Sequence, residues 1–489
     1  MGTVEQHGVG AEQAPYEAFT VEQRGIDIIP PEERHSRPIN LFWIWAGAIV
    51  NIEYVVYGTF LVIFLGLSFP QAIGIIIVGN LISWTFLGLA SLQGPDVGTT
   101  AFMLTRAPYG NNGARPLSVF NWLTQVGYET EGITLVVLAA LALLAKAGAH
   151  DPSDAIKVIL IVAAASVQLV LPIFGHATIS KVFRLLTFLF VALFVILAIL
   201  VAGKANVHLA QHAKFGELVA ALALAIALGG LGWTENANDY SRYMPKETPK
   251  AQIFWAATLG AVIPAILLEV LGAAIATAVS SATDPISGLP KVFPGWFLIP
   301  YLLVAILQLF VINTMDLYSS GLTLQAIGIK LARWQAVLVD TVLCAILTGF
   351  VIFSNSFNKA LSDFVLFTIV WIAPWCGIFL VDWALRRGRY HAMSLAQSRG
   401  GLYYRNGGWH APALVAQAVG MFAALMWINA YPAYLSPLTN RTGGADLSWL
   451  MGLVFGGLTY YLLARDKVRQ EGEATPRQAG VAAAAAPIT

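Results

Sequence analysis

Long apolar runs recur throughout this chain, and they decide what it can fold into. A helix needs about 20 mostly apolar residues to cross the hydrocarbon core of a bilayer. Run length and the Leu, Ala, Val and Gly content favour such helices over the alternating ten-residue strands of a membrane barrel. Twelve spans are expected, at residues 40–66, 70–92, 116–144, 156–175, 182–203, 216–238, 251–279, 296–323, 335–353, 361–384, 411–431 and 446–464.

The composition excludes a water-soluble fold. The 489 residues are 57% hydrophobic and 11% charged, whereas soluble domains carry about 25% charged residues. A net charge of +1 gives no argument for a nucleic-acid partner. Cys344 and Cys376 both lie inside apolar runs, which predicts buried thiols and no disulfide framework. We expect neither a metal nor a cofactor.

The distribution of Lys and Arg predicts the orientation. With the N-terminus in the cytoplasm, 21 of the 28 Lys and Arg residues fall in inner segments, where such residues accumulate. Both termini are therefore expected in the cytoplasm of a cell whose inner or plasma membrane holds the protein. The expected parts are an N-terminal segment (1–39), a transmembrane transporter domain (40–464) and a disordered cytoplasmic tail (465–489).

Acidic side chains inside the spans need an explanation, since each costs about 2.5–3.5 kcal/mol at a span centre. Most of them fall in spans 1, 3, 6 and 8, which also carry other polar and aromatic groups. They are Glu53, Glu129, Glu131, Glu235, Asp239, Glu269 and Asp316.

Two of these spans are interrupted at mid-depth. Glycine and polar residues break the apolar pattern at 46–53 ("AGAIVNIE") and again at 228–236 ("LGGLGWTEN"), five spans later. Paired interruptions in two halves are typical of inverted-repeat transporters, whose broken helices offer free backbone groups to substrate and ion. Non-helical backbone at this depth survives only beside protein or a wet cavity, so the stretch at 228–236 is expected to line a cavity.

Several of these residues have a second interpretation. The glycines at 229–232 can serve close helix packing, and Trp233 can be an interfacial belt residue. Asn313 and Asp316, three apart on one helix face, can join neighbouring helices by hydrogen bonds.

The remaining acidic residues also have alternatives. Glu235 and Asp239 can form a solvated helix end, and for Asp239 this is the favoured interpretation. Glu269 can make a structural hydrogen bond or carry a proton.

Four segments resemble the nucleobase:cation symporter family of cytosine, purine, allantoin and hydantoin permeases, and in particular its cytosine–purine branch. The most specific is the end of the loop after span 2, with Arg106, Pro108, Tyr109, Gly110 and Gly113. The four segments read "VEQRGIDIIPPEERHSRPINLFWIW", "GTTAFMLTRAPYGNNGARP", "GW" with "NDYSRYMP", and "NTMDLYSSGL".

The resemblance implies an all-α membrane protein with a LeuT-type fold. Spans 1–5 (about 40–203) and spans 6–10 (about 216–384) would be inverted repeats of five helices each. Two extra helices would follow at about 411–464. The family holds a planar heterocycle between an aromatic residue of span 3 and one of span 6, which correspond here to Tyr128 and Trp233.

Side chains of spans 1, 3 and 8 would then read the edge of the ring. Stacking on aromatic side chains is worth about 1–3 kcal/mol per base, and polar groups select among edges with fixed donors and acceptors. The candidate substrate-binding residues are Asn51, Tyr128, Glu131, Gly232, Trp233, Asn313 and Asp316.

The chain departs from the family pattern at two places. Gly132 stands where the branch often has an asparagine, and Phe310 and Val311 stand where sodium-coupled members have hydroxyl groups. The second departure favours a proton over sodium as the coupling ion. The ion-coupling candidates are the buried carboxylates Glu53, Glu129, Glu131 and Asp316.

We therefore expect a secondary active symporter for a nucleobase, cytosine or a purine, or a related planar heterocycle, working by alternating access. A transporter of the same fold for allantoin, hydantoin, a vitamin or an amino acid is the alternative. An enzyme is not expected, since no histidine, including His176 at the end of the fourth span, lies inside a predicted span, and no nucleophile–base pair or metal cluster appears there. The expected partners are a small heterocycle, a coupling cation and the lipid bilayer.

Overall fold

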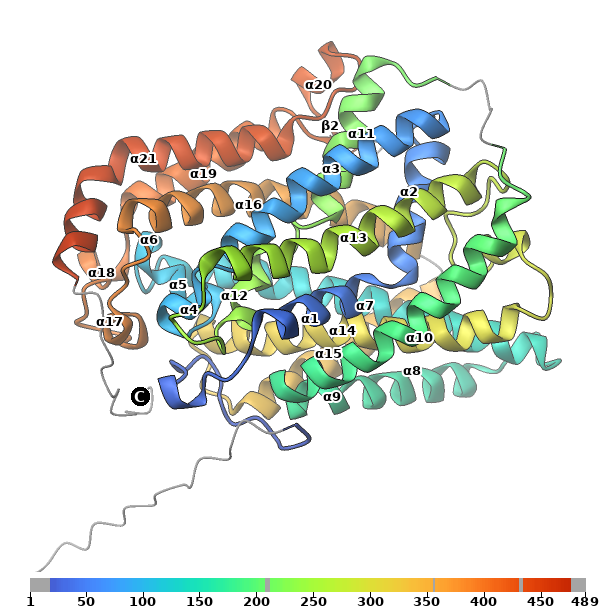
Figure 1. The fold of residues 1–489 in the computed structure, drawn as a ribbon, viewed down its shortest axis with the longest axis horizontal. Coiled ribbons are helices and arrows are strands. Elements are labelled where there is room, and N and C mark those ends of the chain that lie inside the picture. Colours follow the sequence, from blue (N-terminus) through green and yellow to red (C-terminus); the bar gives the residue numbers. More distant parts are fainter. Residues whose placement is uncertain (1–17, 207–211, 355–356, 431–433, 476–489) are drawn as a thin grey trace, which may run out of the picture.

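The fold is a bundle of long helices that run roughly along one direction (Figure 1). The computed structural model describes residues 18–206, 212–354, 357–430 and 434–475. Within them, eight helices are long and apolar enough to cross a membrane, and a bent pair makes a ninth. All twelve predicted ranges contain a helix, so the arrangement is consistent with the predicted twelve spans.

The first half holds spans 1–5 and the second half spans 6–10. The first comprises α1 (Pro38–Ile49) with α2 (Ile52–Ile63), α3 (Phe69–Ala90), α7 (Ala114–Lys146), α8 (Asp154–Gln168) with α9 (Val170–Phe174), and α10 (His176–Ala202). The second comprises α11 (Phe215–Leu228) with η2 (Thr234–Asn236) and α12 (Ala237–Ser241), α13 (Lys250–Ala276), α14 (Leu298–Ile327), α15 (Arg333–Ser354) and α16 (Phe357–Arg386).

Short elements connect these helices. They are η1 (Pro31–Glu33), α4 (Gly94–Val97), α5 (Ala101–Leu104), α6 (Arg106–Tyr109), η3 (Leu289–Val292), α17 (Ala392–Ala396), α18 (Arg405–Gly408), the two-residue strands β1 (Asn429–Ala430) and β2 (Tyr434–Leu435), which pair antiparallel, and α20 (Pro437–Arg441).

Both predicted interruptions are present, and they fall at the start of each half. The α1–α2 pair bends by 58° at Val50 and Asn51. The sixth span stops at Leu228, passes through turns at 229–233 and resumes as η2 and α12. The glycine and polar residues at 46–53 and 228–236 therefore mark real breaks in the helices.

The most specific part of the family-like sequence builds a structural corner. Arg106 is buried and donates from Nη1 to the Leu395 carbonyl at 2.8 Å. Gly110 has a φ of +85°, and a Cβ there would meet the Gly408 carbonyl oxygen at 2.4 Å. Tyr109 donates its hydroxyl proton to Gln417 at 2.8 Å. This loop therefore ties the end of span 2 to α19 (Ala411–Leu425) and to the segment that precedes α19.

The last helix is longer than expected. α21 runs from Ser448 to Ala474, so residues 465–474 of the predicted disordered tail are helical, and residues 476–489 lie outside the described part. The extension is stabilised because Glu471 accepts from Arg386 at 3.1 Å and also binds Arg405. Hydropathy alone missed this, because a charged helix outside the membrane has no apolar run.

The N-terminal segment packs against the ends of four helices through Glu22. The backbone N–H of His176 and the hydroxyls of Tyr318 and Tyr243 donate to its carboxylate, the first at 2.7 Å and the second at 3.0 Å. The guanidinium groups of Arg242 and Arg333 lie 3.4 Å and 3.8 Å away.

Burial would raise the pKa of this carboxyl group, but Arg333 and Arg242 outweigh it. Together with the hydrogen bonds from Tyr243 and His176 they lower the pKa of Glu22 below its ordinary value. The ionised carboxylate thus joins α10, α14 and α15 to Arg242, which directly follows α12.

We predict that Glu22→Gln lowers the melting temperature of the purified protein, since a buried ion pair that loses one partner costs about 3–5 kcal/mol. A lowered pKa stabilises the fold above the unfolded-state value, and this contribution is lost as the pH falls through the folded-state value. The difference between wild type and variant should therefore be constant from pH 8 to pH 5 and shrink below about pH 4.5. Glu32→Gln, at an exposed position, is the control. Equal melting temperatures for wild type and Glu22→Gln at pH 7 would contradict the prediction.

Candidate functional site

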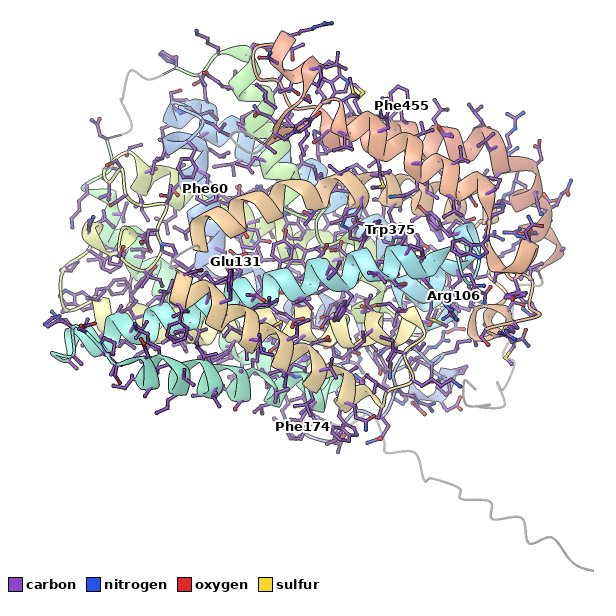
Figure 2. The ribbon with its side chains drawn as sticks, turned by 180° about the vertical axis from the view of Figure 1, so that it is seen from behind. Phe60, Arg106, Glu131, Phe174, Trp375 and Phe455 are labelled. Atoms are coloured by element: carbon purple, nitrogen blue, oxygen red, sulfur yellow. The ribbon has the colours of Figure 1, made fainter. Side chains whose placement is uncertain are left out.

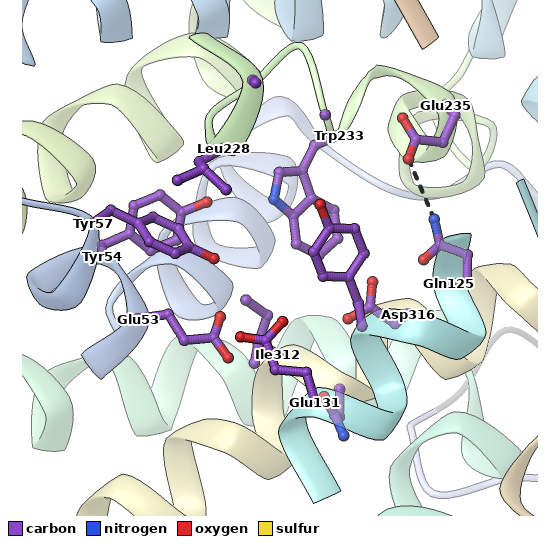
Figure 3. A pocket seen from close by; sticks show the side chains of 14 residues that line it. Glu53, Tyr54, Tyr57, Gln125, Glu131, Leu228, Trp233, Glu235, Ile312 and Asp316 are labelled. Carbon is purple, nitrogen blue, oxygen red and sulfur yellow. Dashed lines mark hydrogen bonds between the residues drawn. The ribbon is translucent and has the colours of Figure 1, made fainter. Parts of the chain in front are cut away.

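The two breaks lie on either side of one cavity near the centre of the bundle (Figure 3). Its walls come from α2, α7, α14 and the broken sixth span, from the end of α11 to η2. Figure 2 shows Glu131, one of its lining residues, midway along α7. The four walls belong to spans 1, 3, 6 and 8, the spans in which the sequence concentrates its polar residues.

Asn51 holds the first break together. Its side chain accepts from the Glu53 backbone N–H at 2.8 Å and donates to the Ala48 carbonyl at 2.6 Å. The break leaves these backbone groups without partners inside a helix. Asn51 is thus the N-cap residue of α2. Its side chain is fully buried and does not line the cavity. In this conformation Asn51 therefore has a structural part at the break, and its contact with substrate stays a prediction.

Ser83 of α3 plays the same part at the second break. Its hydroxyl donates to the Ile226 carbonyl at 2.7 Å and accepts from the Leu231 backbone N–H at 2.8 Å. Gly230 lies against this helix, where an added Cβ would be 2.6 Å from the Ser83 carbonyl oxygen and the Trp84 Cα. Close packing and a helix break, which the sequence left as alternatives, thus occur together.

One face of α7 supplies three lining residues. Gln125, Tyr128 and Glu131 follow one another at three-residue spacing and line the cavity together. Glu129 lies on another face, where the Cys344 thiol donates to its carboxylate at 3.1 Å. Glu129 was predicted as an ion-coupling candidate, but the structure places its side chain away from the cavity.

Four aromatic residues line the cavity, and three of them, Tyr57, Tyr128 and Trp233, remain partly accessible, whereas Tyr54 is fully buried. Tyr128 and Trp233 are both half-buried and line the same space, as predicted. Trp233 packs edge-on against Trp45 of α1 with ring centroids 5.8 Å apart, which fixes its orientation. Tyr54 and Tyr57 of α2 form a second aromatic pair at 5.2 Å on the opposite side of the cavity.

Four carboxylates also face this space. They are Glu53 of α2, Glu131 of α7, Glu235 of η2 and Asp316 of α14. Among the described residues that line the cavity none is Lys, Arg or His. Charge repulsion is strong in a low-dielectric interior, so the group of carboxylates requires protons or a bound cation for neutrality.

Amide groups complete the polar lining. The side chain of Gln125 connects α7 to the second break. Its Nε2 donates to Glu235 at 3.4 Å and to Asn236 at 3.3 Å. Asn313 donates to the Glu129 carbonyl at 3.1 Å and to Gln168 at 3.2 Å. Asn313 thus joins helices while it also lines the cavity.

The packing around Gly132 explains why α7 has no asparagine at this position, where the cytosine–purine branch often has one. A Cβ at this position would lie 2.0 Å from the Asn313 side-chain oxygen. The amide of α14 therefore occupies the volume that a larger side chain on α7 would need.

The cavity is narrow in this conformation. Its volume is about 30 Å³, and one water needs about 10–15 Å³ by the same measure. A ring-sized ligand therefore fits only after lining side chains move apart.

Most of the predicted residues converge here. The cavity brings together Glu53 with Tyr128, Glu131, Gly232, Trp233, Asn313 and Asp316. Sequence reasoning did not assign Tyr54, Tyr57, Gln125 and Glu235 to the site. The spacing of Gln125 from Tyr128 could have predicted that Gln125 lines the cavity, since residues three apart share a helix face.

Two other acidic residues lie elsewhere. Asp239 is 2% exposed and accepts from the Ala101 backbone N–H at 3.2 Å, so the favoured interpretation of Asp239 as part of a solvated helix end was wrong. Glu235, for which a solvated helix end was one alternative, is buried as well. Glu269 accepts from Asn80 at 2.9 Å and does not line the cavity.

The sequence matches a known family over residues 28–452, that of permeases for cytosine/purines, uracil, thiamine and allantoin. The chain belongs to this family. YxlA of Bacillus subtilis, a candidate purine-cytosine permease, is 27% identical over 463 residues, which cover 92% of this chain and 97% of that protein. The purine-cytosine permease fcyB of Emericella nidulans is 22% identical over 471 residues, covering 91% and 88%.

Solved structures of this family show the same fold. Mhp1, a nucleobase-cation-symport-1 family transporter, in a closed conformation with bromovinylhydantoin bound, superimposes with a TM-score of 0.73 at 17% identity. The match covers 93% of this chain and 97% of Mhp1. Its inward-facing conformation gives a TM-score of 0.66 at 21% identity, covering 94% and 100%. The predicted LeuT-type arrangement is thereby confirmed.

We predict that Gly230→Ala destabilises the protein and abolishes transport. The added Cβ would meet backbone atoms of α3 that cannot move independently, and such overpacking costs about 1–3 kcal/mol. Gly349→Ala on α15 is the matched control, since no atom lies within 4 Å of its added Cβ. Melting temperature and uptake should both fall for Gly230→Ala and stay unchanged for Gly349→Ala. A normal melting temperature for Gly230→Ala would disprove the close contact.

Proposed function

We propose that this protein is a secondary active symporter that imports a nucleobase, cytosine or a purine, or a related planar heterocycle, together with a proton. The observation that carries the proposal is the cavity between two broken helices, lined by Tyr128 and Trp233 and by four carboxylates. The names of the relatives as purine-cytosine permeases support the same substrate class. No bond is made or broken in this process.

The lining chemistry suits a flat ring with a polar edge. Aromatic faces at Tyr128 and Trp233 offer stacking, which is worth about 1–3 kcal/mol per base. Amides such as Gln125 donate and accept, while carboxylates accept from ring N–H and amino groups. Because the cavity is rich in acidic groups, a cationic or neutral ring suits it better than the carboxylate of an amino acid.

Proton coupling follows from the charge of the cavity. Glu53, Glu131 and Asp316 face one another without a basic neighbour among the described lining residues. Binding a proton with the substrate would relieve their repulsion and favour the loaded state over the empty one. Sodium is disfavoured because Phe310 and Val311 replace the hydroxyl ligands of sodium-coupled members.

The contacts around Glu22 suit the gate that opens toward the cytoplasm. Under the predicted orientation, the N-terminal segment lies at the inner ends of α10, α14 and α15 and at the end of α12. Opening inward would require some of these contacts to separate. Both termini are proposed to lie in the cytoplasm.

Trp233→Ala should reduce uptake of labelled cytosine or adenine about ten- to hundredfold, because stacking on one ring face is lost. Uptake is measured in cells that lack nucleobase transporters, with a panel of unlabelled bases, allantoin, hydantoins and amino acids as competitors. Trp255→Ala is the matched control, since this tryptophan is 54% exposed on the outer face of α13. Wild-type uptake by a well-expressed Trp233→Ala protein would remove this residue from the site.

Wild-type uptake should rise as the external pH falls from 8 to 6 and should persist when choline replaces sodium. Glu131→Gln should flatten this pH dependence or change which bases compete, since it removes one proton-accepting group. Glu247→Gln, at an exposed loop position, is the charge-matched control. An unchanged pH profile together with unchanged competition would exclude a role for Glu131, and loss of uptake in choline would assign the coupling to sodium.

A further inference from the structure

A second cavity lies outside the bundle centre, between the C-terminal ends of α16 and α21. Its volume of about 620 Å³ is in the range of ligand pockets. The two helices lie side by side (Figure 1), and in the view from behind Trp375 and Phe455 mark them (Figure 2). The transport proposal makes no use of this cavity.

The helices α16 and α21 run parallel, and their C-terminal ends lie next to each other. Along them Gly377 lies against Leu453, and Asp382 accepts from the Tyr460 hydroxyl at 2.7 Å. At the end of α16, Arg386 Cα is 3.0 Å from the position of a Cβ on Gly472.

The length of α21 places this end at the membrane surface. Its 27 residues make a helix about 40 Å long, whereas the hydrocarbon core is about 30 Å thick. The apolar part ends at Ala464, and Arg465 begins the charged part. The cavity therefore lies where lipid headgroups meet the protein.

The outer face of α21 leads from lipid into the cavity. Leu458 and Leu462 are 51% and 61% exposed, as expected for side chains in contact with acyl chains. Tyr461 lines the cavity beside them, and the guanidinium groups of Arg465 and Arg469 lie over its ring at 5.6 Å and 6.0 Å. The surface is thus apolar below, aromatic at the boundary and basic above, an order typical of membrane interfaces.

Three arginines of the cavity have no acidic partner among the described residues. Arg387, Arg389 and Arg469 line it and form no ion pair with any residue in the described ranges. The Nε of Arg389 is buried and has no hydrogen-bond acceptor there. Glu473 is the one lining carboxylate that is likewise unpaired in the described ranges, so positive charge is in excess.

Arg386 has a different part. It is 1% exposed and is fully engaged, with Asp382 at 2.8 Å and Glu471 at 3.1 Å. The pair with Asp382 lies within α16, and the pair with Glu471 joins the end of α16 to α21. Arg386 is therefore a structural part of the cavity floor and is not counted among the arginines that could bind a ligand.

We propose that this cavity binds the phosphate headgroup of an anionic phospholipid. Arg387, Arg389 and Arg469 would contact the phosphate oxygens, and the acyl chains would lie along the exposed leucines of α21. Basic pockets between membrane helices at the surface bind such headgroups, with about 1 kcal/mol per Lys or Arg. A lipid fits better than a soluble anion because the basic group continues directly into a lipid-facing apolar stripe.

The test uses the full-length protein purified into phosphatidylcholine nanodiscs. Dioleoyl phosphatidylglycerol is added, and the lipid that stays bound is counted by native mass spectrometry after release. Phosphatidylglycerol should be retained over phosphatidylcholine and should raise the melting temperature. The double variant Arg389→Gln, Arg469→Gln should bind phosphatidylglycerol about thirtyfold more weakly, while Arg389→Lys should keep most of the affinity.

Arg399→Gln, an exposed arginine outside the cavity, is the charge-matched control and should behave as wild type. Arg469→Gln alone, at an exposed position, gives a readable single variant if the double variant folds poorly. Equal retention of phosphatidylglycerol by Arg469→Gln, Arg399→Gln and wild type would overturn the proposal. An equal rise in melting temperature with inorganic phosphate or glycerol 3-phosphate would assign the cavity to a soluble anion and overturn the lipid assignment.

Discussion

The structure depends on how backbone groups are satisfied where two helices break inside the membrane. Unpaired N–H and C=O groups at this depth cost several kcal/mol each. Asn51 pairs with a backbone N–H and a carbonyl at the first break, and Ser83 does the same at the second. Because these side chains take up the free backbone groups, the chain can open a polar cavity at mid-depth without losing the fold.

The same breaks connect the cavity to the surface. The sixth span resumes as the short helix α12, and Arg242 follows it directly. Arg242 is fully buried and lies between Tyr318 and the Glu22 carboxylate of the N-terminal segment. A movement of the broken span would therefore change the distance between Arg242 and Glu22. Under the proposed proton coupling, the charge of the carboxylates that line the cavity would change when proton and substrate bind, which gives a physical reason for such a movement.

The candidate site was predictable where sequence spacing fixes geometry. Tyr128 and Glu131 are three residues apart and line the cavity together, and the same rule reaches Gln125, which we had not assigned. Glu129 precedes Glu131 by two residues, which turns it by about 200° around the helix and away from the cavity. Its carboxylate meets Cys344 instead. No pattern in one helix says which of its faces points to the cavity.

The sequence alone determined the membrane class, the helical spans and the position of both breaks, because each follows from local composition. Residue spacing also predicted which side chains of α7 and of α14 share a helix face, such as Tyr128 with Glu131 and Asn313 with Asp316. Only the tertiary structure decided that Asn51 closes the first break, that Gly132 makes room for Asn313, and that three arginines gather in a cavity beside exposed leucines of α21. These outcomes depend on the distance between segments far apart in the chain, which is set by packing and not by any local pattern.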